Sequence, residues 1–134
     1  MSAEENLALV RAHYEALTRR DREAALATLA EDVDWEVMGP SSIPFAGPRH
    51  GRAAVGEFFA TIGHTVEVEL FAAERMIAEG NTVVVFGRER FRVKATGRAW
   101  DVAWVQVHWI ADGRIRRFRE YTDTAAIAAA YAAG

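Results

Sequence analysis

The sequence contains no cysteine and only three prolines. The absence of cysteine excludes disulfide bonds, thiol nucleophiles and cysteine-ligated metal sites. All three prolines lie within residues 39–51, so we expect a loop there and regular structure elsewhere. No apolar run is long enough for a membrane span, and the acidic start lacks the apolar stretch of a signal peptide. We therefore expect a soluble, cytoplasmic protein with no membrane partner.

An excess of basic residues is also absent. The formal net charge is -3 at pH 7, so the charge of the chain does not favour nucleic acid as a partner. The 134 residues are 51% hydrophobic and 26% charged, which is typical of a globular protein with one core and a solvated surface. We therefore expect one domain over residues 1–134.

Hydrophobic spacing predicts helices first and long strands later. The first helix would bury Leu7, Val10, Tyr14 and Leu17 on one stripe, with His13 at its margin. The order predicts an α+β fold in which helices cover one face of a curved sheet and enclose a pocket. The predicted helices cover residues 3–19 and 52–62 and the segments capped by Asp21 and Asp123, and the predicted strands cover residues 33–37, 66–79, 82–94, 100–111 and 114–121.

The strand that ends at residue 111 carries the strongest functional signal. Trp104, Gln106, His108 and Ile110 share one face, because strand side chains alternate. An amide and an imidazole among apolar neighbours suggest a functional surface rather than a plain core.

The turn after this strand decides which residues lie opposite. A two-residue turn would place Gln106 opposite Arg119. A three-residue loop with a bulged glycine would place Gln106 opposite Phe118 and Trp104 opposite Glu120. We favour the second register, since it brings Glu120 onto the face of Gln106 and His108.

Several segments resemble the SnoaL and ketosteroid-isomerase type of NTF2-like proteins. The resemblance covers nearly the whole chain and implies a cystatin-like cone, in which a curved mixed or antiparallel sheet and helices on its concave face enclose a pocket. It also implies a homodimer. The matching segments are residues 14–17, 21, 32–37, 45–47, 50–55, 112–115 and 118–125.

The resemblance constrains function less well than fold. Where ketosteroid isomerases carry a general-base aspartate, this chain has Val37, and their second oxyanion donor falls at Gln106. Their tyrosine falls at His13 or Tyr14. The polyketide-cyclase branch is more similar: its Gln-x-His pair matches residues 106–108, although its acid falls nearer residue 122 than Glu120.

These residues suit proton transfer next to a carbonyl. Glu120 in an apolar pocket would have a raised pKa and could act as the base. Gln106 and His108 could donate hydrogen bonds to an enolate oxygen. The chemistry needs no cofactor, and the histidines show no metal-ligand spacing. The expected substrate is a small hydrophobic molecule bound among His13, Tyr14, Trp35, Phe45, Phe58, Trp104 and Phe118.

Structural alternatives exist for each candidate. Glu120 could be a solvated residue paired with Arg116 or Arg119, and Gln106, His108 or Tyr14 could be core groups with satisfied hydrogen bonds. The protein would then be a non-catalytic binder of an apolar ligand, or a dimeric partner protein with a vestigial pocket. The opposite sheet face is apolar and would form the homodimer contact; its residues are Val105, Val107, Trp109, Ile115 and Tyr121.

Overall fold

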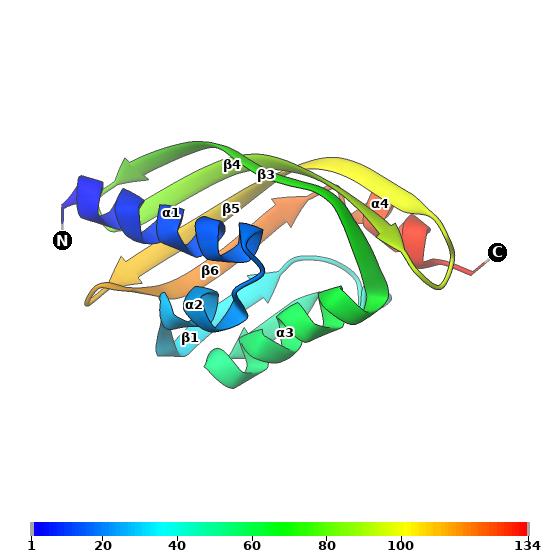
Figure 1. Ribbon diagram of the computed structural model, residues 1–134, viewed down its shortest axis with the longest axis horizontal. Helices are drawn as coiled ribbons and strands as arrows, with labels where there is room; N and C mark the ends of the chain where they lie inside the picture. The colour runs from blue at the N-terminus through cyan, green and yellow to red at the C-terminus, as the bar shows by residue number, and fades with distance from the viewer. Residues whose placement is uncertain (1, 134) are drawn as a thin grey trace.

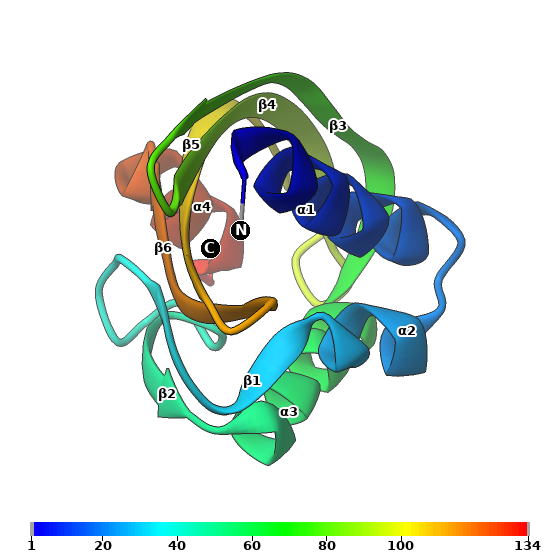
Figure 2. The same ribbon diagram turned by 90° about the vertical axis from the view of Figure 1, so that its left-hand side faces the viewer.

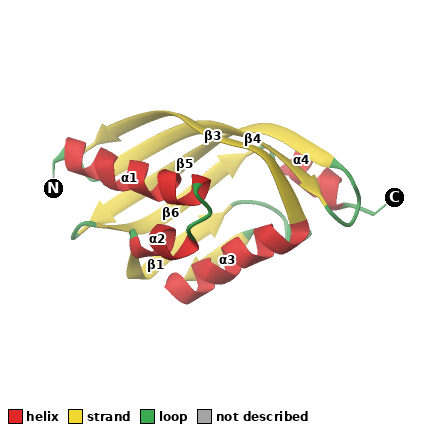
Figure 3. Cartoon of the chain, in the orientation of Figure 1, coloured by secondary structure: helices red, strands yellow, loops and turns green. Residues whose placement is uncertain are grey.

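The computed structural model describes residues 2–133 and has the predicted α+β architecture (Figure 1 and Figure 3). None of its helices is long and apolar enough to cross a membrane. The helices are α1 (Ala3–Thr18), α2 (Arg22–Ala27), α3 (Arg52–Thr65) and α4 (Thr124–Tyr131), and the strands are β1 (Leu29–Val37), β2 (Gly47–His50), β3 (Val66–Glu79), β4 (Thr82–Val93), β5 (Ala99–Ala111) and β6 (Arg114–Thr122).

The strands form one open, mixed sheet in the order β2-β1-β6-β5-β4-β3. β1 runs parallel to β6, and all other neighbours are antiparallel. The sheet is strongly curved, and α1 lies along the open side of the curve (Figure 2). Since α1 packs on β3 and α3 packs on β1, the concave face is covered from both ends.

The first helix begins with a capping box. Oγ of Ser2 accepts a hydrogen bond from the backbone N–H of Glu5, whose carboxylate accepts one from the backbone N–H of Ser2. The predicted apolar stripe is too narrow, because α1 lies within the curve of the sheet. His13 and Tyr14 are both buried, whereas Leu17 is only half-buried.

The end of α1 is a Schellman motif. The backbone N–H of Arg20 donates to the carbonyl of Leu17 (3.0 Å), and that of Asp21 donates to the carbonyl of Ala16 (2.9 Å). Arg20 has a φ of 59°, the left-handed conformation that glycine usually supplies at this position.

The β5–β6 hairpin contains a two-residue turn followed by a bulge. Asp112 and Gly113 both have positive φ angles, 51° and 73°. Arg116 is an extra residue in β6 with no partner in the ladder. The pairs on either side of this bulge are Ile110 with Ile115 and Trp109 with Arg117.

The two-residue turn of the less favoured alternative is confirmed, but the bulge makes the predicted partner of Gln106 wrong in both registers. Gln106 lies opposite Glu120, not Phe118 or Arg119, and His108 lies opposite Phe118. The favoured register nevertheless gave the correct face, because it differs from the observed one by two residues. Ile115 was predicted on the outer face of the sheet, and this is wrong. It lies between the turn and the bulge, and its side chain is completely buried in the core.

Two further predictions differ from the structure. The expected loop over residues 39–51 contains β2, a short edge strand that pairs with β1. The strand expected to start at Val33 already begins at Leu29. The predicted N-caps Asp21 and Asp123 are confirmed, since each side chain accepts a hydrogen bond from the backbone N–H three residues later.

Candidate active site

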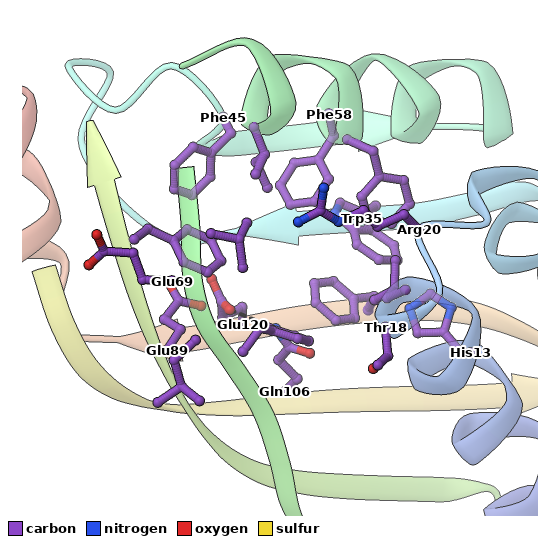
Figure 4. Close-up of a pocket in the computed structure, with 18 residues that line it drawn as sticks. His13, Thr18, Arg20, Trp35, Phe45, Phe58, Glu69, Glu89, Gln106 and Glu120 are labelled. Carbon is purple, nitrogen blue, oxygen red and sulfur yellow. Dashed lines mark hydrogen bonds between the residues drawn. The ribbon is translucent and has the colours of Figure 1, made fainter. Parts of the chain in front are cut away.

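A cavity of about 310 Å³ lies between the concave face of the sheet and helices α1 and α3 (Figure 4). Most of the residues that line it are apolar. The polar residues of its wall are His13, Thr18, Arg20, Glu69, Glu89, Gln106 and Glu120.

Aromatic side chains form most of the wall. Trp35 of β1 stacks on Phe118 of β6, with ring centroids 3.7 Å apart and an interplanar angle of 14°. Phe58 of α3 meets Trp35 edge-on at 5.4 Å. These three residues and Phe45 line the cavity, where the sequence analysis expected them.

Trp104 lies behind the wall instead of on it. Its ring packs beside those of Tyr14 (6.1 Å) and Phe71 (5.2 Å) and is nearly parallel to both. It crosses β4 at Gly87, where an added Cβ would come within 2.2 Å of the indole. Gly87 therefore makes room for Trp104, and Trp104 supports the inner layer of the site.

Glu120 and Gln106 form the buried acidic part of the cavity. Nε2 of Gln106 donates a 2.7 Å hydrogen bond to Oε1 of Glu120. Oε2 of Glu120 has no hydrogen-bond partner within residues 2–133. This atom is not fully enclosed by protein. One carboxylate oxygen is thus held by the protein, and the other is open to the cavity.

The alternative pairing of Glu120 with Arg116 or Arg119 does not occur. Arg116 contacts Asp32 at 3.3 Å, and Arg119 contacts Asp34 at 3.1 Å on the other face of the sheet. Among the described residues, no cationic side chain lies within 4.0 Å of the Glu120 carboxylate. The alternative of a solvated, ion-paired Glu120 is therefore wrong.

Tyr14 and His108 extend this hydrogen-bond network behind the wall. The hydroxyl of Tyr14 lies 2.5 Å from Oε1 of Gln106 and 2.8 Å from Nε2 of His108. Because the amide of Gln106 donates to Glu120, its oxygen accepts the single proton of Tyr14. Nε2 of His108 must then donate to the tyrosine oxygen. In the part of the chain that is described, Nδ1 of His108 has no partner.

His13 has a separate hydrogen-bond arrangement. Its Nδ1 lies 2.9 Å from Oγ1 of Thr28, whose hydroxyl donates to the carbonyl of Ala25. Nδ1 of His13 therefore carries the ring proton and donates a hydrogen bond to Oγ1 of Thr28. The ring lies against the cavity, and its centroid is 5.7 Å from that of His108.

Burial separates the charge states of these groups. It raises the pKa of Glu120 to about 7, although the hydrogen bond from Gln106 opposes the shift. It also lowers the pKa of His13 to about 4 and that of His108 well below its usual value. Both imidazoles are therefore neutral at pH 7, and Glu120 exchanges its proton near neutrality.

Glu89 is a second buried carboxyl group that the sequence analysis missed. It lies on the inward face of β4, lines the cavity, and accepts a 2.6 Å hydrogen bond from Nε1 of Trp100. Burial and the negative charge of Glu120 raise its pKa to about 8. The signal was present in the sequence: β4 alternates Val83, Val85, Gly87, Glu89, Phe91 and Val93 on one face, and the acid interrupts this apolar series.

Arg20 was also not predicted as a site residue. It follows α1, and its side chain reaches the edge of the cavity near Phe58 and Trp35 (Figure 4). No acidic side chain of the described chain lies within 4.0 Å of its guanidinium group. The cavity therefore combines two buried acids with a cationic side chain at its edge.

Comparison with known proteins identifies close structural neighbours. Residues 10–118 match the SnoaL-like domain family. An NTF2-like protein of Burkholderia xenovorans is 32% identical, with 98% of this chain and 99% of that chain covered and a TM-score of 0.89. An NTF2-like protein of unknown function from Burkholderia pseudomallei is also 32% identical, with 99% and 100% covered and a TM-score of 0.88.

A third neighbour was crystallised with a small molecule. TerC, in a co-crystal structure with polyporic acid, is 25% identical to this chain, with 95% of this chain and 98% of TerC covered and a TM-score of 0.84. No functionally curated protein matches the chain.

Proposed function

Since the chain belongs to the SnoaL-like family of NTF2-like proteins, we propose that it is a cofactor-free acid–base enzyme acting on a small hydrophobic carbonyl compound. The observation that carries this proposal is the unpaired Glu120 carboxylate, buried in an aromatic cavity with one oxygen free. A carboxylate without a cation is costly in such surroundings, and its raised basicity is useful for taking a proton from carbon.

In the proposed step, Oε2 of Glu120 takes a proton from a carbon next to the substrate carbonyl. The electron pair of the C–H bond becomes the C=C bond of an enolate, and the charge moves to the carbonyl oxygen. The same carboxyl group can return the proton to another position of the conjugated system. The overall reaction is then an isomerisation. When the enolate carbon instead attacks a second carbonyl and the carboxyl group returns its proton to the new alkoxide oxygen, it is an aldol closure.

Gln106, Tyr14 and His108 orient the base in this proposal. They are hydrogen-bonded to one another and to Glu120, and His108 and Tyr14 are not among the described residues that line the cavity. We therefore assign them to positioning. Residues that hold a reacting group within a fraction of an ångström contribute to rate through geometry.

The ligand class follows from the wall. Trp35, Phe58 and Phe118 offer aromatic surface for a flat, apolar ring. The similarity to TerC, which was co-crystallised with polyporic acid, supports a small molecule as the ligand of this protein.

The test uses a chromogenic carbon acid. 5-Nitrobenzisoxazole loses a carbon-bound proton to a general base and opens to a coloured nitrophenolate. We expect the wild-type protein to accelerate this reaction and Glu120→Gln to lower the rate about a hundredfold or more, while circular dichroism stays unchanged. Glu74→Gln, which removes an exposed acid from β3, is the matched control.

Three outcomes would contradict the proposal. Equal rates for wild type and Glu120→Gln would remove Glu120 as the base. Binding of an apolar ring compound without any proton abstraction would favour a non-catalytic binder, and neither binding nor turnover would favour a vestigial pocket.

A further inference from the structure

The second acid of the cavity, Glu89, occupies a position that a structural role does not explain. It is only 5% exposed, and its neighbours on the inward face of β4 are apolar. Arg88, Arg90 and Arg92 alternate with it but point to the outer face. There Arg88 contacts Asp101 at 2.9 Å, and the other two contact Glu69. Glu89 thus lacks a cationic partner among the described residues.

The one hydrogen bond that Glu89 makes does not require an acid. Its Oε2 accepts from Nε1 of Trp100 at 2.6 Å. A glutamine could accept the same bond through its amide oxygen without placing an ionisable group in the core. The retention of a carboxyl group at a buried, unpaired position costs stability, which points to a use of its proton.

The second oxygen of Glu89 is available for that use. Oε1 has no partner within residues 2–133 and, like Oε2 of Glu120, is not among the atoms fully enclosed by protein. Glu89 and Glu120 reach the cavity from β4 and β6, on either side of β5, and both point into the space between the sheet and α3 (Figure 4).

Two carboxyl groups in one apolar cavity do not readily ionise together. Burial and the charge of Glu120 both raise the pKa of Glu89, so one of the two groups keeps its proton while the other is ionised, and we take Glu89 as the group that keeps it. At neutral pH the cavity then holds a carboxylate and a carboxylic acid. The other candidate donors are weaker acids than a carboxyl group: Gln106 is an amide, one N–H of which donates to Glu120, and the neutral imidazole of His13 donates through Nδ1 to Thr28.

We propose that Glu89 is the general acid of the site and protonates the carbonyl oxygen of the substrate while Glu120 removes the proton from carbon. This inference rests on the proposed function. Oε2 of Glu120 takes the carbon-bound proton, and the C–H electron pair forms the C=C bond. The electrons of the C=O π bond move to oxygen, which takes the proton from Oε1 of Glu89. The product is a neutral enol, and its return to a ketone reverses both transfers and restores both groups.

This arrangement also orients the substrate. The carbonyl oxygen lies at the Glu89 end of the cavity, beside Phe91, and the acidic carbon lies at the Glu120 end, beside Phe118. The suitable class is a hydrophobic ketone with a single carbonyl group, because its enolate is more basic than a nitrophenolate and gains more from a proton donor.

The experiment compares two probes that differ in their need for an acid. 5-Nitrobenzisoxazole expels a stable phenolate and depends mainly on a base. Deuterium exchange next to the carbonyl of 2-tetralone, followed by NMR in D2O, requires both a base and stabilisation of the oxygen. Both rates are measured for the wild type, Glu89→Gln, Glu120→Gln and the exposed control Glu74→Gln.

We expect Glu89→Gln to lower the exchange rate of 2-tetralone about a hundredfold. The same variant should lower the benzisoxazole rate by about tenfold or less. Glu120→Gln should lower both rates together. A wild-type protein inactive on both probes would overturn the proposed function itself. Wild-type activity with an equal effect of Glu89→Gln on both probes, or with no effect, would overturn only the role of Glu89.

A second measurement does not depend on the folding of a variant. Wild-type protein labelled with ¹³C at the glutamate carboxyl carbons is titrated by NMR. We expect two glutamates to titrate well above the others and to lose their separate transitions when 2-tetralone occupies the cavity. The proposal would be overturned if only one glutamate titrated with a raised pKa, or if 2-tetralone left both raised transitions unchanged.

Discussion

Gln106 and Glu120 lie directly opposite each other on β5 and β6, and Nε2 of Gln106 donates a 2.7 Å hydrogen bond to Oε1 of Glu120. This bond fixes one carboxylate oxygen and leaves the other free for a substrate. It also stabilises the charged form of Glu120 against the effect of burial.

Replacement of Gln106 by leucine should therefore raise the pKa of Glu120 further. The pH–rate profile for 5-nitrobenzisoxazole should shift to higher pH, and the plateau rate should fall because the base loses its orientation. A profile measured between pH 5 and 9 provides the check. An unshifted profile would show that the hydrogen bond does not act on the base.

Stability should fall as the pH rises above neutrality. The ordinary pKa of 4.5 is raised in the fold to about 7 for Glu120 and about 8 for Glu89. The folded protein therefore keeps protons that the unfolded chain has released, and this stabilisation is lost as pH rises to about 8. The buried histidines act oppositely: their usual pKa is 6.5, and lowering it in the fold makes stability fall as pH falls below that value.

Between pH 4.5 and 6.5 the glutamates and the histidines change the free energy of unfolding in opposite directions. Above pH 6.5 the glutamates dominate the change. We expect the free energy of unfolding in urea to fall by about 2 kcal/mol from pH 6.5 to 8.5. The double variant Glu89→Gln/Glu120→Gln should lose this dependence. A wild-type stability that is constant over the interval would contradict the burial of two protonated carboxyl groups.

Removal of the Tyr14 hydroxyl should cost more stability than removal of the comparable hydroxyl of Tyr131. Tyr14→Phe leaves Gln106 and His108 without their shared partner, which should cost about 1–3 kcal/mol. Tyr131 makes one partly buried hydrogen bond with Thr65, so Tyr131→Phe should cost about 1 kcal/mol or less. Urea denaturation of both variants tests the difference, and equal losses would argue against the buried network.

Arg20→Gly should stabilise the fold while weakening the binding of anionic ligands. Glycine relieves the left-handed backbone at the end of α1, a gain of about 1 kcal/mol. Loss of the guanidinium group should weaken the binding of 2-naphthoate about two- to fivefold but not that of neutral 2-acetylnaphthalene. Arg19→Gly is the control: Arg19 has an ordinary helical conformation, so glycine should destabilise it.

The outer face of the sheet should bind a second copy of the chain. Phe86, Val105 and Tyr121 lie side by side on β4, β5 and β6, and Phe86 and Tyr121 are 40% and 49% exposed. An apolar row of this kind is typical of an interface. We predict a homodimer by sedimentation equilibrium and a monomer for Tyr121→Glu, with Arg114→Glu as the control. A monomeric wild type would refute this surface as the contact.

Sequence patterns predicted most of the fold, because capping residues and strand alternation act locally. Asp21 and Asp123 start their helices as predicted, and the long strands follow the period-two pattern. The short strand β2 was missed because Pro48 and Gly47 carry no strand signal; its pairing with β1 depends on tertiary structure.

The site was partly predictable for the same reason. The shared face of Gln106 and Glu120 follows from alternation, but their direct pairing depends on a bulge with no clear sequence signal. Glu89 could have been found as an acid within an apolar series. The burial of His13 could not, because it results from the placement of α1 inside the curve of the sheet.

The bulge at Arg116 has a consequence for how chain length can vary in this hairpin. Deleting that residue would leave a regular two-residue hairpin, with every pair from Trp109 and Arg117 onward unchanged. The face that Glu120 presents would be preserved. Homologous chains one residue shorter at this point should therefore carry the same cavity, and a one-residue gap in their alignment belongs at position 116 rather than in the turn.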